Sequence, residues 1–299
     1  MLKHILTAEQ FTQDELKILT NLTASYKGGW NGWDYDGDAT GKLLGTLFFE
    51  PSTRTRWSTE AAMLKLGGQV ISMENAFQSS SDKKGETLED TIKTVSNYCD
   101  VLAIRHPKAE IVSQVADASS VPVINCGDGH NEHPTQALLD YYTIQEHFGR
   151  FDKLNILFTG DLTYSRTIRS LTCLLKDRVQ HIYKTFVKLP DSGPGININI
   201  SEIERILPEI DVVYMTRNQV ERKDTWDEGW SNFIMTSNIA KTLKENAIIM
   251  HPLPRNNEID REVDKLPCAK YFEQTKNGLY MRMALLTVIL AGGFENLAF

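Results

Sequence analysis

Several features that would each fix a protein class are scarce in this 299-residue sequence. Its apolar runs are far shorter than the roughly 20 residues that span a bilayer, so we expect no membrane-embedded part. The four cysteines, at positions 99, 126, 173 and 268, show no CxxC spacing, which argues against zinc and thioredoxin-type motifs. The opening residues, MLKHILTAEQ, lack a long apolar core and a small-residue cleavage site. We therefore expect no secretory signal and a reducing, cytoplasmic location.

An excess of positive charge is also missing. The chain has 32 lysines and arginines against 39 acidic residues, a net charge of −7, so we expect no nucleic-acid partner. Hydrophobic residues make up 41% and charged residues 24%, which is ordinary for a globular protein and excludes disordered, collagen-like and coiled-coil chains. At roughly 100–200 residues per domain, the length predicts two domains.

Short apolar segments alternate with longer helical patterns along the chain. The predicted strands are 43–49, 69–73, 101–105, 122–126, 154–159, 212–216 and 247–250, and the predicted helices are 55–66, 88–98, 109–118, 135–148, 166–175, 201–207, 239–244 and 277–291. This alternation is typical of βαβ units. We predict an α/β fold with two lobes, residues 1–133 and 134–276, each a parallel sheet flanked by helices. The C-terminal helix, at about 277–299, is expected to pack back on the first lobe.

The strongest local motif is FEPSTRTR, residues 49–56, which follows a predicted strand and opens a helix. The unpaired N–H groups of the first helical turn, the hydroxyls and Arg54 together form an anion site. The motif lacks GxxxxGK and is therefore not a Walker loop. Because serine and threonine are common helix caps, an ordinary N-cap with solvent-facing arginines fits these residues about equally well.

Further polar residues follow other predicted strands. They are Arg105 and His106, His133 and Gln136, Arg166, Arg217 and Gln219, and His251 and Arg255. Ligands of open α/β sheets bind outside the carboxyl ends of the strands, so these residues predict one shared crevice. Taken singly, each also fits a surface arginine or a hydrogen-bonded loop histidine. The pair Lys83–Lys84, within SSSDKKGETLED, fits a solvated loop better than a site.

Taken together and in this order, the segments resemble the aspartate/ornithine carbamoyltransferase family over nearly the whole chain. The similar segments are STRTR at 52–56, Ser80 with KKGET at 83–87, RHP at 105–107, HPTQ at 133–136, GDL at 160–162 with Arg166, YMTR at 214–217 with Gln219, and HPLPR at 251–255. Within the family, HPLPR looks like the catalytic chains of the aspartate enzymes. Ornithine enzymes typically carry a cysteine in place of the proline in this segment. Their Ser-Met-Gly signature is also absent from the second lobe here.

The resemblance implies an activity and a set of site residues. The carbamoyl group of carbamoyl phosphate would pass to the amine of L-aspartate, an early step of pyrimidine (UMP) synthesis, without cofactor or metal. The implied catalytic residues are Arg54, Thr55, Lys84, Arg105 and His133. The implied carbamoyl phosphate ligands are Ser52, Thr53, Arg54, Thr55, Arg105, His133, Gln136 and the carbonyls of Leu253 and Pro254. The implied aspartate ligands are Lys84, Arg166, Arg217 and Gln219.

The family also implies a homotrimer with shared active sites, in which Ser80 and Lys84 come from the neighbouring chain. Whether regulatory chains bind stays open. The stretch 178–201 looks shortened relative to the family, which concerns the edge of the second lobe and none of the site residues. Two other functions remain as alternatives: a transcarbamoylase with another acceptor such as ornithine, and a catalytically silent anion-binding protein. The cationic set Lys84, Arg166 and Arg217 disfavours the first, and the complete set of site residues disfavours the second.

Overall fold

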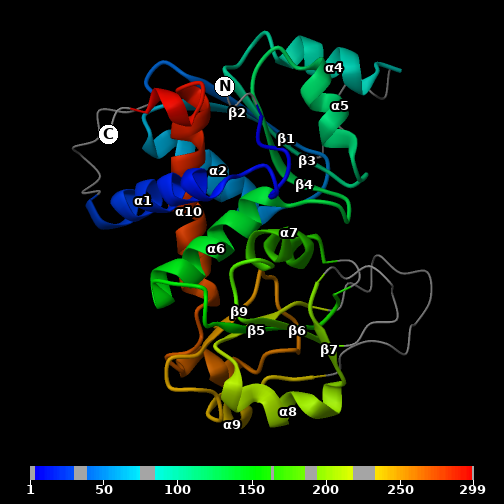
Figure 1. The fold of residues 1–299 in the computed structure, drawn as a ribbon. Coiled ribbons are helices and arrows are strands. Elements are labelled where there is room, and N and C mark those ends of the chain that lie inside the picture. Colours follow the sequence, from blue (N-terminus) through cyan, green and yellow to red (C-terminus); the bar gives the residue numbers. More distant parts are fainter. Residues whose placement is uncertain are drawn as a thin grey trace. The chain divides into compact units, whose positions relative to one another are not determined.

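The computed structural model describes residues 4–29, 39–74, 85–162, 165–185, 194–217 and 233–297 (Figure 1). The chain divides into two compact units. Unit 1 comprises Met1–Tyr142 and Lys276–Phe299, and unit 2 comprises Thr143–Thr275. Both boundaries fall inside helices, α6 and α10. The lobe boundary at 133/134 that we expected from the sequence stays a prediction.

Unit 1 is built on a four-stranded sheet in the order β2-β1-β3-β4, with every neighbouring pair parallel. Its strands are β1 (Leu43–Phe48), β2 (Gln69–Glu74), β3 (Val101–His106) and β4 (Val123–Asp128). Strands β1, β3 and β4 are almost entirely buried, as expected for parallel strands covered on both faces. Strand β2 forms one edge of the sheet and is largely exposed.

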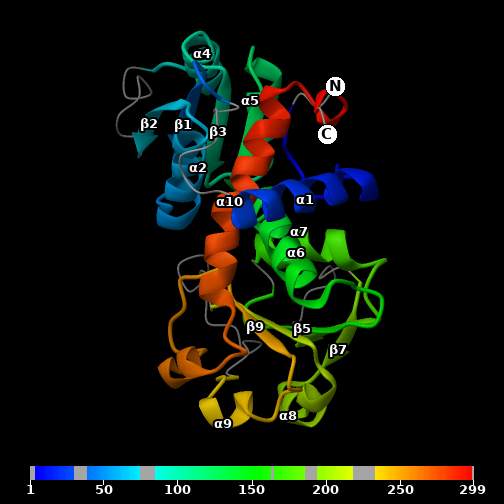
Figure 2. The same cartoon turned by 90° about the vertical axis from the view of Figure 1, so that its left-hand side faces the viewer.

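The helices of unit 1 cover the two faces of this sheet. They are α1 (Gln13–Gly29), α2 (Thr53–Lys65), α4 (Leu88–Val95), α5 (Ile111–Ala118), the first part of α6 (Pro134–Phe148) and most of α10 (Tyr271–Leu290). Helices α4 and α5 lie together on one side, and α1, α2 and α10 on the other (Figures 1 and 2). The Tyr26 hydroxyl of α1 lies 2.6 Å from the Thr287 hydroxyl of α10, which ties the C-terminal helix to the N-terminal one.

Unit 2 is built on a five-stranded parallel sheet in the order β7-β6-β5-β8-β9. Its strands are β5 (Asn155–Thr159), β6 (His181–Thr185), β7 (Ile196–Ile198), β8 (Val212–Met215) and β9 (Ile248–Met250). Its helices are α7 (Arg166–Leu175), α8 (Ile203–Ile206) and α9 (Ser237–Ala240), with short 3₁₀ helices at Ile200–Glu202, Leu207–Glu209 and Arg261–Lys265. A further 3₁₀ turn, Phe294–Asn296, follows α10 in unit 1.

The predicted α/β fold with two parallel sheets flanked by helices is confirmed. Three elements are absent from the predicted elements given above: helix α1 and strands β6 and β7. Strand β6 escaped because its sequence, HIYKT, places a lysine in a segment that is otherwise apolar. Lys184 is nevertheless buried, and this burial lowers its pKa to about 8. In the described residues, no helix combines the length and the apolar character needed to cross a bilayer.

Candidate active site

The predicted anion site lies where strand β1 leads into helix α2. Helix α2 begins at Thr53, and Ser52 is its N-cap residue with extended backbone. Within the described residues the Ser52 side chain makes no capping hydrogen bond, so its hydroxyl is not used to close the helix. The first N–H groups of a helix have no partner inside it and carry the positive end of its dipole. With the half-buried Arg54, this end of α2 is suited to bind an anion.

Thr55 and His133 meet in the interior of unit 1. Thr55 lies in the first turn of α2, and His133 comes immediately before Pro134, the first residue of α6. Both side chains are buried, with 3.4 Å between Thr55 Oγ1 and His133 Nε2. The other ring nitrogen, Nδ1, lies 3.5 Å from Thr135 Oγ1. The fold therefore brings two predicted carbonyl-binding groups within hydrogen-bonding distance of each other.

Arg105 lies at the carboxyl end of β3, beside the segment that joins β1 to α2. The sheet register pairs it with Phe48, and the Phe49 N–H donates to the Arg105 carbonyl oxygen at 2.8 Å. Its Nη2 atom is 2.7 Å from Oε1 of Glu50, and both side chains are largely shielded from solvent. Glu50 thus orients the Arg105 guanidinium, and an anion that binds there has to share it with this carboxylate.

Gln136 lies in the first turn of α6, one turn before Asp140. Both side chains are buried, and Gln136 Nε2 donates a hydrogen bond of 2.9 Å to Asp140 Oδ1. Thr135, between His133 and Gln136, accepts a hydrogen bond of 3.2 Å from Arg282 of α10. The HPTQ motif is therefore anchored to the interior of unit 1 by an acidic and a basic side chain.

The two arginines predicted to bind aspartate follow neighbouring strands of unit 2. Arg166 is the first residue of α7, which follows β5, and Arg217 comes shortly after β8. Strands β5 and β8 are paired in parallel, so their carboxyl ends lie at the same edge of the sheet. Arg166 is buried and Arg217 is half-buried. Topology alone therefore places both guanidinium-bearing segments at one edge.

Gly160 allows these strand ends to approach each other. Its φ is +110°, and a Cβ at this position would overlap the carbonyl oxygen of Thr216. The Thr216 N–H donates to the Thr159 carbonyl oxygen at 2.9 Å, and the Thr216 hydroxyl donates to the Asp161 carbonyl oxygen at 3.2 Å. Only glycine fits this contact, so the glycine of the GDL segment sets the spacing of the two arginine-bearing segments.

The HPLPR loop follows β9 and is held by one buried histidine. Leu253 N–H donates to His251 Nδ1 at 2.8 Å, and His251 Nε2 lies 2.8 Å from Glu258 Oε1. Because Nδ1 accepts a hydrogen bond, the ring proton is on Nε2 and is donated to the carboxylate. Leu253 has a left-handed backbone with φ of +54°, and the Leu253–Pro254 peptide bond is cis. The carbonyl-bearing segment is thus tied to the core through His251 and Glu258.

Three candidates from the sequence are engaged in other contacts. Arg56 forms ion pairs with Glu60 at 2.8 Å and with Glu74 at 2.6 Å. Arg255 pairs with Asp264, and its guanidinium lies 5.1 Å from the ring centroid of Tyr271. Arg56 therefore holds elements of unit 1 together, and Arg255 holds elements of unit 2 together.

His106 is the third of these candidates. Its ring lies 4.9 Å from that of Phe49, its Nδ1 accepts the Lys108 N–H at 3.0 Å, and burial lowers its pKa. A neutral, buried ring in these contacts is a packing element of the strand end.

Sequence analysis did not single out three carboxylates that orient site residues: Glu50, Asp140 and Glu258. Burial alone would raise the pKa of Glu258, but hydrogen bonds from His251 and from the Asn256 N–H outweigh it and lower the pKa. Two of them carry a sequence signal: Glu50 lies within the FEPSTRTR motif, and Asp140 lies four residues after Gln136 on a predicted helix.

Ser80, Lys84 and Gln219 lie outside the described residues, so their predicted roles stay predictions. The described ranges contain no group of three or more histidine, cysteine or acidic side chains that could hold a metal ion.

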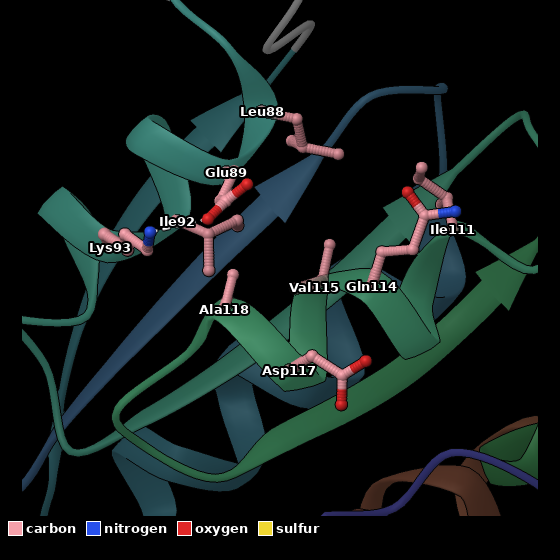
Figure 3. Close-up of a pocket in the computed structure, with 9 residues that line it drawn as sticks. All are labelled: Leu88, Glu89, Ile92, Lys93, Ile111, Gln114, Val115, Asp117 and Ala118. Atoms are coloured by element: carbon pink, nitrogen blue, oxygen red, sulfur yellow. Dashed lines mark hydrogen bonds and ion pairs between the residues drawn. The ribbon is translucent and has the colours of Figure 1, made fainter.

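A separate groove of about 500 Å³ lies between helices α4 and α5 of unit 1 (Figure 3). Its apolar floor, with Ile92 and Val115, belongs to the core cluster of this face of the sheet. Glu89, Lys93 and Asp117 stand at its sides. Of the predicted site residues that the structure describes, none lines this groove.

Comparison with protein families matches both parts of the chain. Residues 3–146 match the profile described as "Aspartate/ornithine carbamoyltransferase, carbamoyl-P binding domain", and residues 152–289 match "Aspartate/ornithine carbamoyltransferase, Asp/Orn binding domain". The aspartate carbamoyltransferase catalytic subunit of Archaeoglobus fulgidus is 41% identical over 299 residues, covering 97% of this chain and 100% of the relative. Aspartate carbamoyltransferase 2, chloroplastic, of Pisum sativum is 41% identical over 306 residues, covering 97% and 80%.

Solved structures agree with these sequence matches. The aspartate transcarbamoylase of Trypanosoma cruzi in complex with N-(phosphonacetyl)-L-aspartic acid superposes with a TM-score of 0.87 at 35% identity, covering 96% of this chain and 95% of that one. The catalytic subunit of M. jannaschii aspartate transcarbamoylase superposes with a TM-score of 0.86 at 37% identity, covering 97% and 98%. With both family profiles matched in order and relatives alike over almost its full length, the chain belongs to the aspartate/ornithine carbamoyltransferase family.

Proposed function

We propose that the chain is an aspartate carbamoyltransferase, which forms N-carbamoyl-L-aspartate and phosphate from carbamoyl phosphate and L-aspartate in pyrimidine biosynthesis. The relatives named above are aspartate enzymes, and solved Trypanosoma cruzi relatives contain carbamoyl phosphate and aspartate. The observation that carries the proposal is the arrangement in unit 1. An uncapped helix N-terminus stands beside a buried Thr55–His133 pair.

Unit 1 supplies the groups that carbamoyl phosphate needs. Its phosphate is bound by Ser52, Thr53 and Arg54 with the N–H groups of the first turn of α2. The carbonyl oxygen gains negative charge as the amine attacks, and Thr55, Arg105 and His133 donate hydrogen bonds to it. His133 acts here as a donor, so the reaction needs no base on this ring.

The carbamoyl NH₂ group is held by hydrogen-bond acceptors. These are Gln136 and the backbone carbonyls of Leu253 and Pro254. As the amine nitrogen bonds to the carbonyl carbon, the bond from that carbon to the bridging phosphate oxygen breaks, and the departing phosphate takes the amine proton. Catalysis is then positioning and electrostatic stabilisation, with no covalent enzyme intermediate.

Unit 2 supplies the groups that aspartate needs. The forked guanidinium groups of Arg166 and Arg217 each match the geometry of a carboxylate, and aspartate has two carboxylates. Gln219 and Lys84 complete the proposed set. Ornithine would bring a second amine, which these cations repel, so the cationic pair at the β5 and β8 ends favours the dicarboxylate.

The assay compares acceptors in one protein preparation. The purified chain is incubated with carbamoyl phosphate and either aspartate or ornithine, and the carbamoylated amino acid is quantified. We expect N-carbamoyl-L-aspartate and little citrulline. Thr55→Val, which keeps the side-chain shape but removes a donor, should lower turnover by roughly a hundredfold, as the loss of one oxyanion donor does. A preference for ornithine, or no product with either amine, would overturn the proposal.

We further propose a homotrimer in which Ser80 and Lys84 reach the neighbouring chain's site. Three large apolar side chains on α2 and the edge strand β2 support a subunit interface there: Trp57, Leu64 and Ile71 are 70%, 59% and 58% exposed. Exposed apolar patches beside an open sheet edge are typical of interfaces. Light scattering of the purified chain measures the assembly mass, and a monomer would contradict the trimer.

A regulatory partner chain and the cellular location of the protein remain predictions. Relatives are named catalytic subunits, so we keep a regulatory partner chain as a candidate. We place the protein in the cytoplasm on its sequence features, whereas the Pisum sativum relatives are named chloroplastic. Co-purification from the native cell and fractionation of that cell test these two predictions.

A further inference from the structure

Gln136 and Asp140 form a buried hydrogen-bonded pair in which the chemistry of the two groups decides which one donates and which one accepts. Gln136 is 9% exposed and Asp140 is fully buried, and Gln136 Nε2 lies 2.9 Å from Asp140 Oδ1. An ionised carboxylate only accepts hydrogen bonds, so the amide group that faces it has to be the NH₂ group. The amide oxygen, Gln136 Oε1, is on the opposite branch of the planar amide and therefore turns away from Asp140.

A buried cation interacts with Asp140. Arg282 of α10 is buried in the same unit, and it donates to Thr135 Oγ1 at 3.2 Å and to the Gly278 carbonyl oxygen at 3.0 Å. Burial lowers the pKa of Arg282 to about 10, against opposing interactions with Cys126 and, to a lesser extent, Asp140, so the guanidinium is charged at neutral pH. The buried positive charge of Arg282 attracts the Asp140 carboxylate.

We propose that Asp140 is a positioning residue that determines substrate specificity, by holding Gln136 with Oε1 toward the carbamoyl NH₂ group. This inference rests on the proposed function. Three acceptors are assigned to that NH₂ group. Two of them, the Leu253 and Pro254 carbonyls, can only accept hydrogen bonds. A glutamine amide can turn over and present its own NH₂ group instead. Asp140 removes this choice, so the site requires a hydrogen-bond donor on the acyl group and disfavours acyl phosphates that carry a methyl group there.

The test uses two stable ligands that differ in one group. Phosphonoacetamide has an NH₂ group on its carbonyl carbon, and 2-oxopropylphosphonate has a methyl group in the same place. Their dissociation constants are measured by calorimetry for the unaltered chain, for Asp140→Asn, for Gln136→Leu and for the double variant. Asp100→Asn is the control, because the Asp100 carboxylate likewise accepts an N–H hydrogen bond, here from the Leu43 backbone at 2.8 Å, but lies outside the proposed site.

We expect the unaltered chain and the control to prefer phosphonoacetamide by about tenfold or more. An asparagine at 140 can face Gln136 with either its oxygen or its nitrogen, so the glutamine is no longer held in one orientation. The preference should then fall by about fivefold, within the range expected for releasing one polar side chain. In the Gln136→Leu background, Asp140→Asn should have no further effect, since Asp140 acts through Gln136.

Three results would overturn the inference while leaving the proposed function intact. They are equal binding of both ligands by an unaltered chain that makes carbamoylaspartate, equal weakening of both ligands by Asp140→Asn, and a persisting effect in the Gln136→Leu background. An unaltered chain that neither forms product nor binds either ligand would instead overturn the proposed function, and the inference with it.

If Asp140→Asn does not fold, hydrogen exchange in the unaltered chain tests the inference instead. The Gln136 side-chain NH₂ signal, identified by its loss in Gln136→Leu, should exchange slowly with and without phosphonoacetamide. Rapid exchange, or new protection only on ligand binding, would show that the NH₂ group does not face Asp140 and would overturn the inference.

Discussion

Replacing Glu258 tests whether a single carboxylate supports the HPLPR loop. Glu258→Ala leaves His251 Nε2–H without its acceptor, and His251 is 1% exposed, so water does not replace the lost partner. The Asn256 N–H, which donates to the same carboxylate at 3.1 Å, lies in an exposed residue and can be hydrated. One buried hydrogen bond to a charged group is therefore lost, a destabilisation of about 1.5–3 kcal/mol.

Glu258→Gln is the matched control, because its amide oxygen can still accept the His251 proton. We expect it to cost less than about 1 kcal/mol, the difference between a charged and a neutral acceptor. Both variants are compared with the unaltered chain by urea denaturation followed by circular dichroism. In the activity assay, Glu258→Ala should also raise the KM for carbamoyl phosphate several-fold, since the Leu253 N–H is held by the same histidine.

The pH dependence follows from the lowered pKa of Glu258 in the folded state. A depressed carboxyl pKa contributes stability above the ordinary value of about 4.3, and this contribution disappears as pH falls through the folded-state pKa. The advantage of the unaltered chain over Glu258→Gln should thus be constant above about pH 5 and shrink below about pH 4. Equal stability of Glu258→Ala and the unaltered chain, or equal losses in both variants, would refute the proposed support of the loop.

Three other predictions address the remaining parts of the site. Arg217→Ala should raise the KM for aspartate more than the KM for carbamoyl phosphate; steady-state kinetics with each substrate varied measures this, and equal shifts would contradict the assignment. Gly160→Ala should destabilise the chain by about 2 kcal/mol or more, because its Cβ would overlap the Thr216 carbonyl at a positive φ; an unchanged denaturation midpoint would contradict the close contact. Mixing and reassembling the inactive variants Lys84→Gln and Arg54→Ala should restore about one site in three in a hybrid trimer with shared sites. Absence of recovered activity in well-mixed hybrids would place each site within one chain.

The sequence by itself determined the fold class, and it predicted the segments of the proposed site. Buried parallel strands appear as short apolar runs between helices, and residues that follow such strands are collected at one edge of a sheet by the topology itself. This is why Arg105 beside the β1–α2 segment, and Arg166 near Arg217, could be predicted as neighbours within their units. Strand β6 escaped this reasoning because Lys184 interrupts its apolar pattern.

The tertiary structure alone decided which polar residues are used for packing and which orient the site. The motifs treat Arg54 and Arg56 alike, yet the second is paired with Glu60 and with Glu74, a residue of strand β2 that no local pattern connects to it. The pair His251–Glu258 likewise depends on how the loop after β9 folds back, and that path is set by contacts with the core. Hydrogen bonds and ion pairs form over a few ångströms, so the partner of a side chain is fixed only once distant segments have packed together.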